Sequence, residues 1–181
     1  HIFPVLLKLE GAETLDGIGH KDNFSHTLQV LDNLAANSDD VWLRWAALLH
    51  DIGHFTSEFG TFAMTDTHDR QHEVFGAKVL APFFPEKVTQ CVRHHVAAKR
   101  YLCATRSEYF SQLSVASVHS LHLQGGPMSA TEVAEFEANP HLQDIIQVRL
   151  LDDAGKVADL QTYDFAYFVD LLQALVDQHC H

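Results

Sequence analysis

An apolar segment that ends in a histidine–aspartate pair constrains this chain more than any other feature. Residues 41–49 are apolar at nearly every position, and His50 and Asp51 follow at once. A helix that is apolar on all sides lies inside a protein, and Ser38-Asp39-Asp40 supplies side chains that can cap its start. Burying an imidazole and a carboxylate is costly unless a metal ion or a polar network compensates. The segment therefore predicts a buried helix, residues 41–51, that presents a polar site to the core.

Helical periodicity also dominates the rest of the chain, and no segment alternates at period two for long enough to predict a sheet. Gly53 is expected to end the helix described above, and Gly76 to let a neighbouring helix approach closely. Ser129 and Glu132 have the spacing of a capping box. We expect an all-α helical bundle that forms a single domain over residues 1–181. The predicted helices are residues 24–36, 41–51, 69–81, 85–102, 107–113, 115–121, 131–138, 143–151 and 163–179.

Composition narrows the functional classes. The chain has 181 residues, 12 Lys and Arg against 24 Asp and Glu, and a formal charge of −12. Such a negative charge disfavours nucleic acid and anionic membranes as partners, since both attract positive surfaces. No apolar run is long enough for a membrane span and no secretory leader is visible. The three Cys are too few for a disulfide framework, so we expect a cytoplasmic protein.

Histidine is abundant, and its placement is informative. The chain has 14 His, more than Lys and Arg together. Successive predicted helices each carry a His or a carboxylate near an apolar face, which is how helical bundles build metal sites in their cores. Nitrogen and carboxylate ligands without thiolate suit iron, manganese or zinc. These residues are His26, the pair His50-Asp51, His72, His94-His95 and the pair Asp152-Asp153.

A simpler interpretation of the histidine–aspartate pair also exists. His50 could cap its own helix while Asp51 pairs with a lysine on the surface. The other histidines and carboxylates on neighbouring helices favour a metal site over this interpretation.

The pattern of these residues resembles the HD-domain superfamily, whose signature is H…HD…D. The matching residues here are His26, His50-Asp51 and Asp152. The resemblance implies one metal ion bound by these four residues. It implies a second ion bound by His72 and His95, with Asp51 bridging the two. Asp152 is preferred to Asp153 because Asp152 and Lys156 together match the family pattern.

Strings in the later part of the chain resemble a narrower group, the PhnZ-type HD-domain oxygenases. The strings are residues 95–102, 113–117, 123–128 and 152–156. This resemblance implies a mixed-valent pair of iron ions, Fe2+ and Fe3+, in a cytoplasmic enzyme. It also implies the reaction: O2 cleaves the carbon–phosphorus bond of a 1-hydroxyalkylphosphonate to give phosphate and a carboxylic acid.

A phosphonate dianion needs cations and hydrogen-bond donors in its site. Lys99 lies four residues after His95, so the two share a helical face, and His54 lies four residues after His50 and could donate to the same anion. The resemblance implies that His54, Lys99 and Ser117 hold the phosphonate, with His54 and Lys99 as the catalytic residues. A lysine that extends to the surface, and a serine that bonds its own helix backbone, are the plainer alternatives.

The N-terminal third departs from this group. Members specific for an aminoethyl substrate carry a Tyr-Ile-Gly-Glu string before the first ligand, whereas this chain has Gly17-Ile18-Gly19-His20. This difference favours hydroxymethylphosphonate, or a differently substituted phosphonate, over the aminoethyl compound as the substrate. Residues 20–33 and 42–51 also resemble the HD modules of certain tRNA nucleotidyltransferases, which we interpret as shared scaffold sequence.

The expected partners are a small phosphonate and O2, with the protein a monomer or a homodimer. The alternative function is a metal-dependent HD phosphohydrolase that acts on a nucleotide or phosphomonoester through a metal-activated water. A third possibility is an HD domain that binds a ligand or partner without catalysis.

Overall fold

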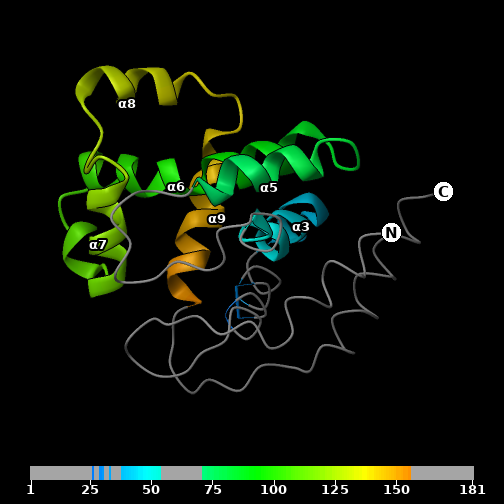
Figure 1. Ribbon diagram of the computed structural model, residues 1–181, viewed down its shortest axis with the longest axis horizontal. Coiled ribbons are helices and arrows are strands. Elements are labelled where there is room, and N and C mark those ends of the chain that lie inside the picture. Colours follow the sequence, from blue (N-terminus) through cyan, green and yellow to red (C-terminus); the bar gives the residue numbers. More distant parts are fainter. Residues whose placement is uncertain (1–25, 27–28, 31–32, 34–37, 54–70, 156–181) are drawn as a thin grey trace.

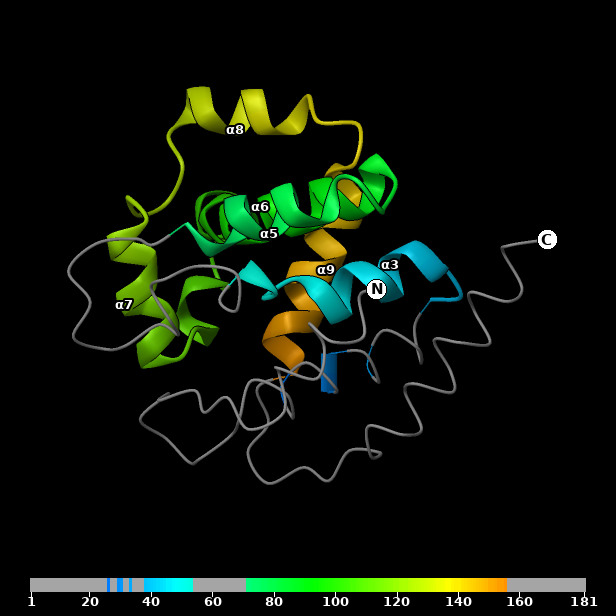
Figure 2. The same cartoon turned by 45° about the vertical axis from the view of Figure 1, so that its right-hand side comes forward.

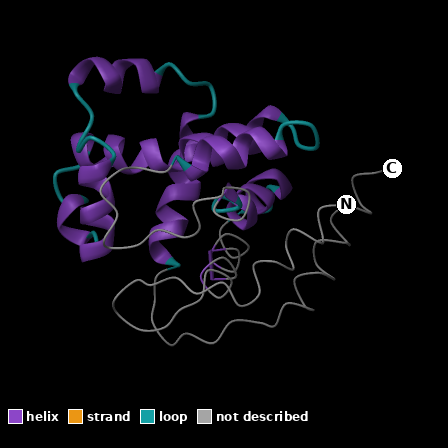
Figure 3. Cartoon of the chain, in the orientation of Figure 1, coloured by secondary structure: helices purple, strands orange, loops and turns teal. Residues whose placement is uncertain are grey.

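The computed structural model describes residues 26, 29, 30, 33, 38–53 and 71–155 of the chain (Figure 1). This part consists of helices and loops and has no strand (Figure 3), which confirms the all-α expectation. Residues 26, 29, 30 and 33 are helical, in agreement with the first predicted helix. The predicted helix 163–179 lies outside the described residues. The helices are α3 (Val41–Leu49), α5 (His72–Leu80), α6 (Glu86–Thr105), α7 (Val115–Leu123), α8 (Ala130–Glu137) and α9 (Leu142–Ala154).

Helix α6 organises the bundle. Helices α3, α5 and α9 all pack against it, and Figures 1 and 2 both show α5 alongside α6. Its buried side chains recur three or four residues apart, which is the spacing of one helical face. His95 and Lys99 belong to that buried stripe, between Val92 and Leu102. The face of α6 that carries the core therefore also carries two of the predicted functional residues.

Helix α3 is buried over most of its length, as its sequence predicts, although Trp42 near its start is 37% exposed. The helix ends two residues earlier than expected. Asp40 caps its start by accepting hydrogen bonds from the backbone N–H groups of Trp42 and Leu43 at 2.9 and 3.2 Å. At the other end, the Nδ1 atom of His50 lies 2.7 Å from the carbonyl oxygen of Ala47. This carbonyl would otherwise accept from the backbone N–H of Asp51. The pair His50-Asp51 consequently lies in the turn after α3.

Two glycines allow close packing between this turn and α5. A Cβ atom on Gly53 would lie 1.8 Å from the carbonyl oxygen of His72, so only glycine fits. The sequence predicts that Gly53 ends a helix. In the structure, the missing side chain of Gly53 lets the first residue of α5, His72, contact the turn after α3. A Cβ atom on Gly76 would meet Gly53, Ile52 and Val92 at 3.2 Å each, which confirms the predicted close approach of another helix.

The prediction of a regular helix over residues 107–113 is wrong. This segment forms turns and a short 3₁₀ helix, Phe110–Gln112. The hydroxyl of Ser111 there donates to the carbonyl of Glu108 at 2.7 Å, and such a bond competes with helical hydrogen bonds. Tyr109 is also drawn into the protein, where only 6% of its surface is exposed. The burial of Tyr109 and the local bond of Ser111 therefore outweigh the helical pattern.

The later helices follow the sequence more closely. Ser129 and Glu132 form the predicted capping box at the start of α8. Gly125 and Gly126, at φ of 93° and 74°, make the turn between α7 and α8. Within the described residues, no helix combines the length and apolar character that crossing a membrane requires.

Candidate metal centre

Six predicted residues from five helical segments meet in one cluster. His26 comes from the N-terminal helix and His50-Asp51 from the turn after α3. His72 is the first residue of α5, His95 lies on α6, and Asp152 lies near the end of α9. The cluster is therefore a product of the whole bundle.

The first part of the cluster joins the N-terminal helix, α3 and α9. The Nε2 atom of His26 lies 2.9 Å from Oδ1 of Asp152. The Nε2 atom of His50 lies 3.7 Å from the same oxygen and 3.3 Å from Oδ2 of Asp51. Two imidazole nitrogens and two carboxylates thus converge, and the ligand atoms of His26, His50 and Asp51 are close enough together to hold a metal ion.

The second part joins Asp51 to α5 and α6. The Oδ1 atom of Asp51 lies 3.3 Å from Nε2 of His72 and 3.6 Å from Nε2 of His95. The two imidazole nitrogens are 3.1 Å apart. These three residues form a second group whose ligand atoms could hold a metal ion.

Asp51 belongs to both groups. Its Oδ2 atom faces His50, and its Oδ1 atom faces His72 and His95. A carboxylate with one oxygen towards each group has the geometry of a bridging ligand.

Backbone carbonyls orient the histidine rings. The Nδ1 atom of His50 contacts Ala47, that of His95 contacts Val92 at 2.8 Å, and that of His26 contacts Gly155 at 3.3 Å. Metal-binding histidines commonly use one ring nitrogen in this way, which leaves the other for the ion. The Nε2 atom of His50 is buried and makes no hydrogen bond in the described part of the chain. A metal ion would satisfy this nitrogen, so the residues present fit a metal.

The electrostatics of the cluster favour a cation. Burial alone would lower the pKa of His50, but the nearby carboxylates of Asp51 and Asp152 outweigh it and raise this pKa to about 9. Burial, together with the charges of His72 and His50, holds the pKa of His95 well below its usual value. A neutral His95 is suited to metal binding, because a ligand nitrogen must be unprotonated.

Asp152 rather than Asp153 faces the cluster. The carboxylate of Asp153 is turned to Arg149 and Tyr109, and its Oδ2 atom accepts a hydrogen bond from Nε of Arg149 at 3.1 Å. The Nη1 atom of Arg149 lies 2.7 Å from Oδ2 of Asp152. Lys156, which supported the choice from sequence, lies outside the described residues.

The structure describes two of the three residues that are predicted to bind the phosphonate. Lys99 is 3% exposed, so it does not extend to the surface, and its Nζ atom donates to Oγ of Ser120 at 2.6 Å. Ser117 is also buried, and its Oγ atom accepts from the hydroxyl of Ser114 at 3.1 Å. The hydroxyl of Ser120 in turn donates to the carbonyl of Ser117 at 3.0 Å. His54 lies outside the described residues.

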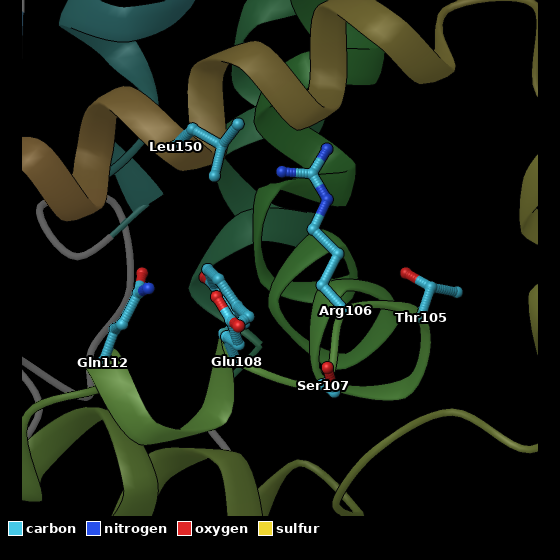
Figure 4. A pocket seen from close by; sticks show the side chains of 7 residues that line it. Thr105, Arg106, Ser107, Glu108, Gln112 and Leu150 are labelled. Atoms are coloured by element: carbon cyan, nitrogen blue, oxygen red, sulfur yellow. The ribbon is translucent and has the colours of Figure 1, made fainter.

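A separate hollow lies at the turn after α6 (Figure 4). It has a volume of about 330 Å³ and is lined by residues 105–109, Gln112 and Leu150. None of the six clustered residues lines it, so it is distinct from the candidate metal centre.

Sequence reasoning missed three residues near the site. Ser120 lies three positions after Ser117 on α7, so helical spacing could have indicated it. Arg149 interrupts an apolar helix three positions before Asp152, which is also a signal. Tyr109 gave no such signal, because its contact with Arg149 spans 40 positions of sequence.

Comparisons with known proteins identify the family of this chain. The HD domain family matches residues 23–154. The [1-hydroxy-2-(trimethylamino)ethyl]phosphonate dioxygenase (glycine-betaine-forming) of Leisingera caerulea is 60% identical over 154 residues, which cover 85% of this chain and 79% of that protein. The hydroxymethylphosphonate dioxygenase of Gimesia maris is 46% identical over 128 residues, which cover 66% of this chain and 60% of that protein.

The matched family and the clustered His and Asp residues define an HD-domain protein with a candidate metal site. More narrowly, the chain belongs to the PhnZ-type HD-domain dioxygenases, the group that its sequence resembles.

Proposed function

We propose that this protein is a di-iron dioxygenase that cleaves the carbon–phosphorus bond of a 1-hydroxyalkylphosphonate. The observation that carries the proposal is the position of Asp51, whose two oxygens face two separate groups of histidines. A phosphohydrolase with one metal ion needs only the first group, whereas His72 and His95 add a second. The two relatives described above, from L. caerulea and G. maris, are named as phosphonate dioxygenases.

In this proposal His26, His50, Asp51 and Asp152 hold one iron, and Asp51, His72 and His95 hold the other. The pair, mixed-valent when active, supplies the sites at which O2 and the substrate's oxygens bind. The overall reaction balances without another reductant: RCH(OH)PO3H2 and O2 give RCOOH and H3PO4. The substrate carbon provides four electrons and O2 accepts all four.

Lys99 has the chemistry to hold the phosphonate. Its ammonium lies in a buried setting, where a charge-assisted hydrogen bond to an anion is stronger than in water. The bond to Ser120 directs the ammonium, and an ammonium has three N–H donors, so it can serve more than one oxygen. Ser117, one turn before Ser120 on α7, adds a hydroxyl, and His54 is the third proposed contact.

The substituent on the substrate is proposed from the relatives. The L. caerulea enzyme is named for a trimethylaminoethyl phosphonate, and the G. maris enzyme for hydroxymethylphosphonate. We propose the trimethylaminoethyl compound as the first substrate to test, since the identity to that enzyme is the higher of the two.

The test begins with protein purified without oxygen. Two irons per chain, a mixed-valent EPR signal and O2-dependent release of phosphate from a 1-hydroxyalkylphosphonate are expected. The panel contains the hydroxymethyl, aminoethyl and trimethylaminoethyl compounds. A single bound Mn, Mg or Zn with turnover of phosphomonoesters would instead establish the phosphohydrolase and refute the proposal.

A variant tests the role of Lys99. The substitution Lys99→Met keeps most of the length of the side chain and removes its charge, so we expect a large rise in KM for the phosphonate with both irons retained. Lys78→Met is the matched control, because Lys78 is exposed on α5. Loss of iron from the Lys99 variant would show that the assigned role is wrong.

A further inference from the structure

The two oxygens of Asp152 have different surroundings. Its Oδ1 atom faces the candidate metal centre, 2.9 Å from Nε2 of His26 and 3.7 Å from Nε2 of His50. Its Oδ2 atom points the other way and lies 2.7 Å from Nη1 of Arg149. The carboxylate is therefore oriented with a single oxygen towards the cluster.

Arg149 is itself held from two directions. Asp153, one turn along α9, pairs with its Nη2 and Nε atoms. The hydroxyl oxygen of Tyr109, from the turn that follows α6, lies 3.1 Å from Nε. The planar guanidinium is thus fixed at three nitrogens, and rotating it would break contacts with both Asp153 and Tyr109.

The burial of this group needs an explanation. Arg149 is only 4% exposed, and burying a guanidinium is expensive even when it is paired. The carboxylates of Asp152 and Asp153 both pair with the guanidinium and compensate this cost. Because Oδ1 of Asp152 faces the candidate metal centre while Oδ2 pairs with Arg149, Asp152 joins this ion-pair network to that centre.

We propose that Arg149 is a positioning residue that fixes Asp152 as a one-oxygen ligand, with Asp153 and Tyr109 fixing Arg149 in turn. This inference rests on the proposed function, because it takes Asp152 as a ligand of one of the two irons. A purely structural ion pair would affect only the free energy of unfolding. A positioning residue also changes the affinity of the folded protein for the iron that Asp152 binds.

The experiment measures ferrous iron binding under argon, with a coloured chelator as competitor, at a temperature where each variant is folded by circular dichroism. The variants are Arg149→Lys, Asp153→Asn and Tyr109→Phe. Loss of such a supporting contact commonly weakens metal binding by about 10- to 100-fold. We expect a loss in this range for one of the two irons in Arg149→Lys and Asp153→Asn, and a smaller loss of the same ion in Tyr109→Phe.

Arg100→Lys is the matched control. Arg100 also forms a partly buried ion pair, with its Nη2 atom 2.7 Å from Oε1 of Glu132, and its Nε atom donates to the carbonyl of Gly126, so these contacts lie on α8 and the turn before it rather than in the metal cluster. It should lose stability without losing iron affinity. Tyr109→Phe removes a single oxygen, so it keeps the inference testable if the Arg149 variant does not fold.

The outcomes separate the two proposals. Wild-type protein that binds fewer than two irons would refute the proposed function. Wild-type protein that binds two, with affinities in all three network variants within twofold of wild type, would overturn the positioning role alone. Equal weakening of both irons would also overturn it, since Arg149 contacts Asp152 and not Asp51.

Discussion

The contact between Gly53 and His72 provides the sharpest test of how the fold builds the site. In Gly53→Ala, the new Cβ atom would lie 1.8 Å from the carbonyl oxygen of His72 and 2.6 Å from its carbonyl carbon. Ordinary contact begins at 3.4 Å, so the backbone at His72 must move by about 1.6 Å. A metal ligand tolerates displacements of only about 0.2 Å. The substitution should therefore separate His72 from Asp51 and His95.

The energetic cost follows from the same contact. Overpacking costs about 1–3 kcal/mol, and a clash with backbone belongs at the upper end. For a chain of this size, about 3 kcal/mol lowers Tm by roughly 6–12 °C. Gly53→Ala should show this fall in differential scanning calorimetry, and iron analysis should show that the ion at His72 and His95 is lost first.

A matched control separates local conformation from the clash. Gly126→Ala places the same methyl group at φ of 74° with no atom within 4 Å, so only the backbone preference is violated, at about 1–2 kcal/mol. Its iron content should be unchanged. If Gly53→Ala binds two irons and unfolds within about a degree of wild type, the reasoning from this contact is wrong.

Two further predictions concern helix caps. Ser114→Ala removes the hydroxyl that accepts a hydrogen bond from the backbone N–H of Ser117 at 3.1 Å. We expect this to lower the free energy of unfolding by about 1 kcal/mol, measured as a lower midpoint of urea denaturation. An unchanged midpoint would contradict this prediction. Hydrogen bonds from the backbone of Ser129 and from Arg100 lower the pKa of Glu132 to about 2, against 4.5 for the free side chain. Because the folded-state pKa is depressed, this stabilisation is present above about pH 4.5 and is lost as the pH falls towards 2. Glu132→Gln should thus have a lower urea midpoint than wild type at pH 7, and the gap should narrow below pH 4.5; a gap independent of pH would count against this assignment.

Much of the fold could be predicted because helix formation is governed by local patterns. The apolar run before His50 indicates a buried helix, and the Ser129–Glu132 spacing indicates a helix start; both features are present. The segment 107–113 shows the limit of this approach. Its helical pattern is overridden by the side-chain bond of Ser111 and by the contact of Tyr109 with Arg149, a residue 40 positions away.

The sequence by itself determined which residues could hold metal ions. Helical periodicity predicts that these His and Asp residues lie at the ends or on the buried faces of successive helices, and this periodicity is visible in the sequence alone. It could not determine how the oxygens of Asp51 and Asp152 are oriented, because a carboxylate's orientation depends on partners from other helices. Only the tertiary structure shows Asp51 between two histidine groups, and Asp152 with one oxygen towards the cluster and the other towards Arg149. The physical reason is that periodicity sets the face of a helix on which a residue lies, whereas packing sets what that residue meets.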